Sequence, residues 1–380
     1  MSEWKKVRLG EIANYVNEKI DIKAFDTSLY ISTDSMLKDK GGIGTPESIP
    51  ESGKVTKYQH NDILVSNIRP YFKKIWFSNR EGGCSNDVLV FRANDNIDST
   101  FLYYVLSDDS FFDHIMSSAN GTKMPRGNRK LIPSFEINLP PLSTQHRIAT
   151  ILSRYDSLIE NYQKQIKLLE EAAQRLYKEW FIDLRFPGHE NTNIVDGVPE
   201  GWEKKKVADV VVFYDKMRKP LSSMQRQSME KIYPYYGAAS LMDYVDNYLF
   251  DGTYLLMGED GTVISNEKYP MLQYVWGKFW VSNHAHVLQG KEPYSTEFIY
   301  MMLKQMTILD VVTGAAQPKI SQGRLAAKEI IMPANELVKE YDKIVVPMIQ
   351  QAKSLQSQIR LLTEARDRLL PKLMNGEIEV

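Results

Sequence analysis

The sequence predicts an α+β fold with two tandem globular domains, each built on a twisted β-sheet, and two long helices that form an antiparallel coiled coil. Three observations predict this fold: an apolar stripe over residues 148–180, a second stripe over 341–373, and landmarks that recur at a nearly constant offset. Recurrence in an unchanged order indicates a tandem duplication. The expected segments, in chain order, are domain 1 (1–142), a central helix (143–186), domain 2 (187–333) and a C-terminal helix (334–380).

The first stripe begins at Ile148 and continues with alternating spacings of four and three residues. This 3.5-residue period keeps one narrow face toward a partner helix, and the flanking positions carry mixed charge, as solvated faces do. At about 1.5 Å per residue such a helix is roughly 50 Å long. The seam residues are Leu152, Tyr155, Ile159, Tyr162, Ile166, Leu169 and Leu176.

The second stripe repeats the first one 193 residues later, which makes it the expected partner. Antiparallel pairing places the two domains in pseudo-twofold relation at opposite ends of the helices. Arg366 interrupts this seam, and Pro347 falls inside it, so we expect a looser seam and either a kink or a later helix start. The seam residues here are Val345, Met348, Leu355, Ile359, Leu362 and Leu369.

The domains themselves share landmarks at offsets that drift only from 198 to 193. In order, the pairs are Trp4 with Trp202, Asn86 with Asn283, Phe101 with Phe298, Gly121 with Gly314, and Pro125 with Pro318. Each match is weak alone, but their constant order favours one module used twice.

Local patterns predict short strands followed by a helix in each domain. Arg69-Pro70 marks a turn between two strands, and Gly258 to Gly261 marks a turn in domain 2. Ser99 and Thr296 are suitable helix N-caps, and Phe186-Pro187-Gly188 is expected to end the central helix. The strands are expected at 63–65, 75–77, 88–91, 254–257 and 279–281.

The composition is that of a globular protein: 43% of residues are hydrophobic, 25% are charged, and the net charge is −1. Cys84 is the single cysteine, which excludes an intrachain disulfide and a cysteine metal cluster. Because no apolar run approaches 18 residues, we expect no membrane association and a cytoplasmic location. A near-zero net charge argues against a protein that coats nucleic acid by charge alone, but it allows local basic patches.

Signatures of catalysis are missing, so we expect no catalytic residue and no enzyme activity in this chain. No Gly-Lys pair has the upstream glycine or the following Ser/Thr of a phosphate loop. Asn138-Leu139-Pro140-Pro141 has the wrong order for the box that holds the target amine in amino-methyltransferases. His284 and His286 would share a strand face, but no clear third ligand accompanies them. We therefore expect no metal, and we interpret His286 as a packed, hydrogen-bonding residue.

Three segments concentrate positive charge and are candidates for DNA contact: the turn near Arg69, the acid-free loop 123–130, and residues 216–226. Arg and Lys contact phosphates and guanine edges, while Asn and Gln can read adenine edges. The alternative is that the loops are simply solvated and that Asn86 and Asn283 make Asx turns. The candidates are Asn67, Arg69, Lys73, Lys74, Asn86, Lys123, Arg126, Arg129, Lys130, Lys219, Asn283, His284, Gln317 and Lys319.

Over its whole length the chain resembles the DNA-specificity subunit of Type I restriction–modification systems. The most specific matches are Trp180-Phe181-Ile182-Asp183, Val198-Pro199-Glu200-Gly201-Trp202 and the C-terminal segment 368–378. Segments 62–70 and 258–286 also resemble the target-recognition domains of that family.

The resemblance implies that each domain reads one half of a split, asymmetric site in double-stranded DNA. It also implies that the helices set the gap and dock two methyltransferase subunits, which bind S-adenosylmethionine, and that endonuclease/translocase subunits join them. No cofactor is expected in this chain itself. Two alternatives remain at this point: a coiled-coil scaffold whose end domains bind proteins, and a stand-alone modification enzyme.

Overall fold

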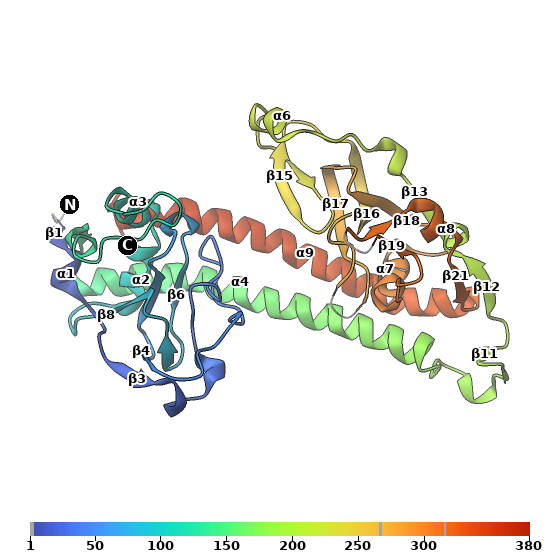
Figure 1. Ribbon diagram of the computed structural model, residues 1–380, viewed down its shortest axis with the longest axis horizontal. Helices are drawn as coiled ribbons and strands as arrows, with labels where there is room; N and C mark the ends of the chain where they lie inside the picture. Colours follow the sequence, from blue (N-terminus) through green and yellow to red (C-terminus); the bar gives the residue numbers. More distant parts are fainter. Residues whose placement is uncertain (1–3, 266–267, 315–316) are drawn as a thin grey trace. The chain divides into compact units, whose positions relative to one another are not determined.

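The structure of the protein is a computed structural model, which describes residues 4–265, 268–314 and 317–380. The chain forms two compact units, which we call unit 1 (1–161 and 358–380) and unit 2 (162–357). The two long helices, α4 (Leu142–Tyr177) and α9 (Asn335–Met374), each contribute residues to both units (Figure 1). The sequence-predicted segments therefore differ from the compact units, because each unit packs its sheets against parts of both helices.

Unit 1 holds three small sheets, with strand orders β1-β9, β2-β8-β5-β6 and β3-β4-β7. All of its strand pairings are antiparallel. Its elements are β1 (Lys5–Arg8), α1 (Leu9–Ile12), β2 (Ala13–Tyr15), β3 (Lys19–Asp21), β4 (Lys54–Tyr58), β5 (Ile63–Ser66), η3 (Pro70–Phe72), β6 (Ile75–Phe77), β7 (Gly82–Cys84), β8 (Val88–Ala93), α2 (Ser99–Ser107), α3 (Asp109–Ser117), η4 (Ile132–Ser134) and β9 (Glu136–Leu139).

Unit 2 is built around a six-stranded sheet of order β13-β18-β16-β17-β14-β15. The pairs β12-β21, β10-β11 and β19-β20 lie outside this sheet. Its elements are β10 (Ile194–Val195), β11 (Val198–Pro199), β12 (Glu203–Lys206), α5 (Val207–Val210), β13 (Val211–Phe213), η7 (Asp215–Met217), α6 (Ser223–Gln227), β14 (Tyr233–Tyr236), β15 (Leu241–Val245), β16 (Phe250–Gly258), β17 (Leu272–Val281), β18 (Ala285–Gly290), α7 (Thr296–Gln305), β19 (Val312–Thr313), β20 (Lys319–Ile320), α8 (Gln322–Ala327) and β21 (Glu329–Met332).

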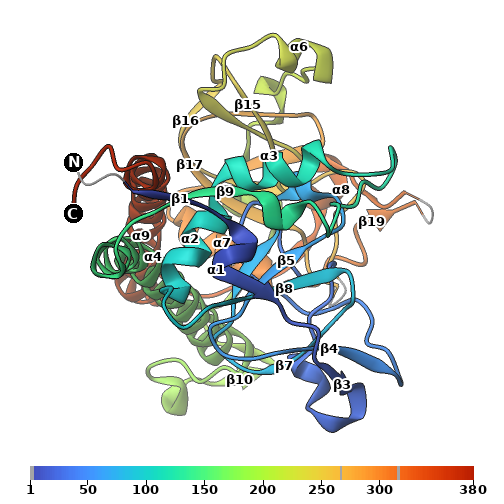
Figure 2. The same cartoon turned by 90° about the vertical axis from the view of Figure 1, so that its left-hand side faces the viewer.

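The two long helices pack against each other in antiparallel fashion within each unit. In unit 1, Ile148 and Leu152 of α4 share one hydrophobic core with Leu370 and Leu373 of α9, beside α2 (Figure 2). In unit 2 the hydroxyl of Tyr341 in α9 donates a hydrogen bond of 3.0 Å to the carbonyl of Ala173 in α4. All the predicted seam residues are buried or partly buried, as a coiled-coil seam requires.

Matching hydrogen bonds in the two units confirm the predicted internal repeat. Leu9 N donates to Phe135 O at 2.8 Å in unit 1, and Val207 N donates to Lys328 O at 3.0 Å in unit 2. The order β2-β8-β5-β6 of unit 1 reappears as β13-β18-β16-β17 in unit 2. The predicted α+β fold with a duplicated module and paired long helices is confirmed.

The structure corrects several local expectations. Helices α2 and α7 are capped one residue earlier than predicted, because the side chains of Asp98 and Ser295 accept the backbone hydrogen bonds. The α-helical part of α4 ends at Tyr177 and continues as a π-helix to Ile182, so the helix stops before Phe186-Pro187-Gly188.

The structure also shows how the second seam accommodates Pro347 and Arg366. Helix α9 begins at Asn335 and is continuous through Pro347, so of the two predicted alternatives the later start was wrong. Arg366 does not leave a gap, because its guanidinium pairs across the helices with Asp156, with Nη1 2.6 Å from Oδ1. Among the residues that the structure describes, no helix is long and apolar enough to cross a membrane.

Candidate nucleic-acid interface

In unit 1 the basic loop after α3 is bound by its backbone to the end of the central strand β5. Arg69 N donates to Pro125 O at 2.8 Å, and Gly127 N donates to Asn67 O at 3.2 Å. Asn67 N in turn donates to Asp87 O at 2.9 Å, in the turn before β8. The predicted loop 123–130 and the predicted turn near Arg69 therefore form one surface.

The close approach of this loop depends on a glycine. A Cβ atom added to Gly127 would lie 2.8 Å from Asn67 Oδ1 and would also clash with Ile115. A side chain at this position would push the loop away from β5, because real Cβ atoms do not approach other atoms so closely.

Unit 2 makes the same connection at equivalent positions. Ile320 N donates to Glu259 O at 2.8 Å, and Glu259 N donates to His284 O at 2.8 Å. The isolated bridge between Asp260 and Lys319 matches the bridge between Ile68 and Arg126 in unit 1. Arg126 and Lys319 thus occupy the same position of the repeated module, 193 residues apart, on the segment that follows the domain helices.

The side chains of the unit 1 loop present unpaired positive charge. Arg126 Nη2 lies 3.1 Å from Asp87 Oδ2, but Lys123, Arg129 and Lys130 are exposed. Within the described part of the chain, no acidic side chain lies within ion-pair distance of those three. The Arg129 guanidinium lies 5.5 Å from the ring of Tyr15. Burial raises the pKa of Tyr15 to about 12, and the charge of Arg129 opposes this shift only in part.

The connection between β5 and β6 is strained and holds unsatisfied polar atoms. Arg69 and Lys73 have φ angles of +49° and +48°, in the left-handed region that side-chain-bearing residues rarely adopt. Asn67 is 7% exposed, and its Oδ1, like Arg69 Nε, is buried without a hydrogen-bond partner. Strain and unsatisfied polar groups concentrate at functional sites, so both features favour a ligand-binding role for this turn.

Two lysines of the same turn make internal contacts. Lys73 Nζ lies 2.7 Å from Asp109 Oδ2. Lys74 Nζ donates a hydrogen bond of 2.6 Å to the carbonyl of Thr33, and burial lowers its pKa. Both side chains are partly buried, so their contribution to a DNA surface is smaller than the sequence suggested.

The candidate amides Asn86 and Asn283 are both exposed and stand in equivalent turns before β8 and β18. Asn86 Oδ1 accepts a hydrogen bond from Lys19 Nζ at 2.5 Å, and Asn283 offers its backbone carbonyl to Arg218. Each amide is adjacent in sequence to the residue, Asp87 or His284, whose carbonyl accepts the hydrogen bond from Asn67 N or Glu259 N.

In unit 2 two of the candidate side chains, Lys319 and His284, lie beside acids. Lys319 Nζ lies 3.8 Å from Glu259 Oε1, and His284 Nδ1 lies 2.5 Å from Asp260 Oδ1. Gln317 is exposed beside Lys319, and Lys219 is exposed while its carbonyl accepts a hydrogen bond from Trp280. The structure thus places Gln317, Lys319, His284 and Asn283 on neighbouring segments of unit 2.

Several sequence interpretations of unit 2 were wrong. Arg218 and Arg226 are not solvated cations, because their side chains are 13% exposed and pair with Glu259 and Asp243 at 2.6 and 3.1 Å. His284 and His286 do not share a strand face. His284 precedes β18 and is exposed, whereas His286 lies inside β18 with 0% exposure.

Sequence reasoning missed the acids of these sites, namely Asp87, Glu259 and Asp260. The repeat held a signal for the two acids of unit 2, because Glu259-Asp260 occupies the position that Asn67-Ile68 occupies in unit 1. The sequence does not show which acids lie beside the basic residues, because these neighbours in space are distant in sequence.

One group of side chains has the geometry to hold a metal ion: ligand atoms of Asp215, Glu259 and His286 lie within 4.8 Å of one another. The Arg218 guanidinium already supplies positive charge there, at 2.6 Å from Glu259 Oε2 and 3.6 Å from Asp215 Oδ2. A divalent cation would have to displace this arginine, so the residues present do not favour a metal.

Two copies of one α+β module, each with a cation-bearing loop fastened to equivalent strand ends, define a tandem recognition protein. The sequence profile of the Type I restriction modification DNA specificity domain matches residues 1–171 and 199–359. The chain therefore belongs to this family and carries the domain twice, which confirms the resemblance.

Named relatives of the chain are specificity subunits of Type I restriction enzymes. The chain is 26% identical to the Type I restriction enzyme MjaIX specificity subunit of Methanocaldococcus jannaschii, over 75% of this chain and 70% of that protein. It is 24% identical to the Type I restriction enzyme HindI specificity subunit of Haemophilus influenzae, over the full length of both. The crystal structure of a Type I restriction–modification S subunit from M. genitalium shares the fold, with a TM-score of 0.61 at 18% identity, over 98% of this chain and 96% of that one.

Proposed function

We propose that this chain is the non-catalytic DNA-specificity subunit of a Type I restriction–modification complex, in which each unit reads one half of a bipartite, asymmetric site. The observation that carries the proposal is the equivalent placement of Arg126 and Lys319 on loops bridged to the central strand of each repeated module. A shared framework with different side chains at the reading positions suits two half-sites of different sequence.

The chemistry of each surface matches readout of duplex DNA. Exposed Lys and Arg contact phosphates, and Arg can bind guanine by two hydrogen bonds in the major groove. The exposed amides of Asn86, Asn283 and Gln317 supply paired donors and acceptors that fit adenine edges. Asp87, Glu259 and Asp260 can accept from cytosine amino groups.

The remaining roles are divided between the long helices of this chain and the partner subunits. The paired helices α4 and α9 set the gap between half-sites and dock two methyltransferase subunits. These subunits bind S-adenosylmethionine, and endonuclease/translocase subunits complete the complex. The support for a non-catalytic chain is its family membership together with the absence of catalytic motifs from its sequence.

Exchange of one module tests the proposal. Residues 1–142 are replaced by the equivalent segment of another specificity subunit, and the adenine methylation of DNA is mapped in cells that also carry the partner subunits. We expect a bipartite motif for the original protein and a change in one half only for the hybrid.

A change in both halves, or methylation without a bipartite motif, would refute modular reading. As a control, the purified chain alone is incubated with DNA and S-adenosylmethionine. Methyl transfer by the chain alone would overturn the assignment of catalysis to a partner.

A further inference from the structure

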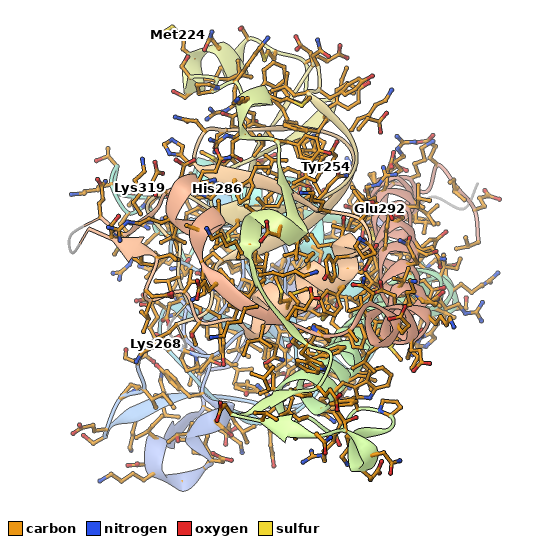
Figure 3. The ribbon with its side chains drawn as sticks, turned by 90° about the vertical axis from the view of Figure 1, so that its right-hand side faces the viewer. Met224, Tyr254, Lys268, His286, Glu292 and Lys319 are labelled. Atoms are coloured by element: carbon orange, nitrogen blue, oxygen red, sulfur yellow. The ribbon has the colours of Figure 1, made fainter. Side chains whose placement is uncertain are left out.

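A buried histidine, His286, binds β20 to the sheet of unit 2 (Figure 3). His286 Nε2 lies 2.8 Å from the carbonyl oxygen of Ile320 in β20, and its Nδ1 lies 2.6 Å from Asp215 Oδ2 in η7. A carbonyl oxygen only accepts hydrogen bonds, so Nε2 is the donor to Ile320. The ring therefore joins β18, η7 and β20 at a point with no access to solvent.

Charged groups continue from this histidine to the surface. Asp215 Oδ1 accepts a hydrogen bond of 2.9 Å from Val287 N, which fixes the carboxylate. Glu259 Oε2 lies 3.8 Å from His286 Nδ1, and Glu259 Oε1 lies 3.8 Å from Lys319 Nζ.

Arg218 holds the two carboxylates together. Its Nη1 donates to Glu259 Oε2 at 2.6 Å and to the carbonyl of Ala285 at 2.7 Å, and its Nη2 lies 3.6 Å from Asp215 Oδ2. The charged groups that face His286 are thus Asp215, Glu259 and Arg218. The outer end of the network is Lys319, a candidate DNA contact.

The repeated module does not itself demand this histidine. In unit 1 the equivalent position of the sheet is Leu89, which is also fully buried and pairs with Val65 as His286 pairs with Met257. The unit 1 loop is held to its sheet by backbone bonds from Gly127 and Arg69, and the hydroxyl of Tyr15 in β2 donates a hydrogen bond of 3.2 Å to the carbonyl of Arg129. In unit 2 the bond comes instead from His286, a fully buried side chain of β18, and it ends at Ile320, directly after Lys319.

We propose that His286 is a positioning residue, which holds β20 and the adjoining Gln317 in place for reading the half-site of unit 2. The inference rests on the proposed function, because it assumes that this segment contacts DNA. A buried hydrogen bond to the segment's own backbone fixes Lys319 more precisely than its exposed ion pair can, since exposed pairs contribute little.

Hydrogen exchange of the full chain tests the connection without DNA. We compare His286→Leu, which introduces the residue found in unit 1, with His286→Gln, whose amide can donate to the same carbonyl. We expect exchange in peptides covering β19 and β20 to accelerate about tenfold or more in the leucine variant, while β16 and β17 stay protected. The glutamine variant should recover most of the protection.

The proposal is overturned if β19 and β20 exchange as in the original protein, or if β16 and β17 lose protection equally, because His286 would then be an ordinary core residue. His286→Asn, which is polar but too short to reach Ile320, serves as the test if the leucine variant does not fold. Leu89→Met in unit 1 is the matched control and should leave β19 and β20 unchanged.

DNA discrimination tests the consequence. The probes are duplexes carrying the methylated site mapped for the original protein, with single base changes in either half, bound by the complex with the partner subunits. We expect His286→Leu to lose about tenfold discrimination in the half read by unit 2 and to keep the other half within about twofold. Equal losses in both halves, or none, would contradict the positioning role. Lack of discrimination by the original protein would instead refute the proposed function.

Discussion

The two units differ in polarity at equivalent positions of the contact between the domain helix and the long helices. Where α2 meets the long helices in unit 1, Asp156 accepts hydrogen bonds from Tyr104 Oη at 2.5 Å and from Arg366 Nη1 at 2.6 Å. The equivalent residues of unit 2, by the offsets of the repeat, are Ile349, Met301 and Ala173, and all three belong to one buried apolar core.

The difference teaches that the duplicated framework fixes positions but not polarity. A partly buried polar network stabilises a fold little more than a well-packed apolar core, since the cost of desolvation offsets much of the attraction. It is nevertheless costly to break, because Asp156 loses its cation while it stays partly shielded from water. Unit 1 therefore depends on the integrity of its network, and unit 2 has no such dependence at this place.

The largest effect is expected from breaking the network at one point. Arg366→Ala leaves the partly buried Asp156 with Tyr104 as its remaining partner and should lower the free energy of unfolding by about 2 kcal/mol, measured by denaturant titration. The control is the triple variant Tyr104→Met, Asp156→Ile and Arg366→Ala, which copies unit 2. Its stability should match or exceed that of the original protein. A triple variant less stable than Arg366→Ala alone would contradict the comparison.

The two candidate DNA surfaces also differ in charge, because Lys123, Arg129 and Lys130 of unit 1 are exposed without an acidic partner among the described residues, whereas Lys319 of unit 2 lies beside Glu259. Replacing Lys123, Arg129 and Lys130 by Ala should weaken binding to the mapped site by roughly 10- to 100-fold at low salt. It should also lower the slope of log affinity against log salt by up to about 2.7, since each phosphate contact contributes about 0.9.

The matched variant is Lys319→Ala in unit 2, which removes one cation that already pairs with Glu259. Its effect on the slope should stay below about 0.9. Both are measured on the assembled complex, with thermal melting as the check on folding. Equal slopes for the two variants would remove the distinction between the surfaces.

The smallest effect concerns the helix caps. In unit 1 the cap Asp98 contacts His146 of α4, whereas in unit 2 the cap Ser295 donates a hydrogen bond of 2.9 Å to Asp342 of α9. Burial raises the pKa of Asp342 to about 6, the charge of Glu297 adds to the shift, and the Ser295 hydrogen bond opposes it.

A raised pKa in the folded state contributes stability that is complete below the unfolded value of 3.8 and is lost as pH rises through about 6. Asp342→Asn removes the charge and keeps the acceptor for Ser295. The full shift corresponds to about 3 kcal/mol, but the carboxyl is only partly buried, so we expect the variant to be about 1 kcal/mol more stable at pH 8. The advantage should disappear near pH 4. An advantage that does not change between pH 8 and pH 4 would show that Asp342 is not its source.

The sequence by itself determined the duplicated α+β fold and the antiparallel helix pair, because these follow from two patterns that can be read along the chain. One is the 3.5-residue apolar period of α4 and α9, and the other is the nearly constant offset of the landmarks. Burial of the seam residues depends only on that period.

Only the tertiary structure decided which loops meet and which charges are free. Arg126 pairs with Asp87 across 39 residues, and His286 contacts Asp215 across 71. No local pattern encodes such contacts, because they arise where separate strands end side by side. For the same reason, Arg218 belonged to a predicted basic segment for DNA contact in the sequence, but in the fold it is a largely covered partner of Glu259.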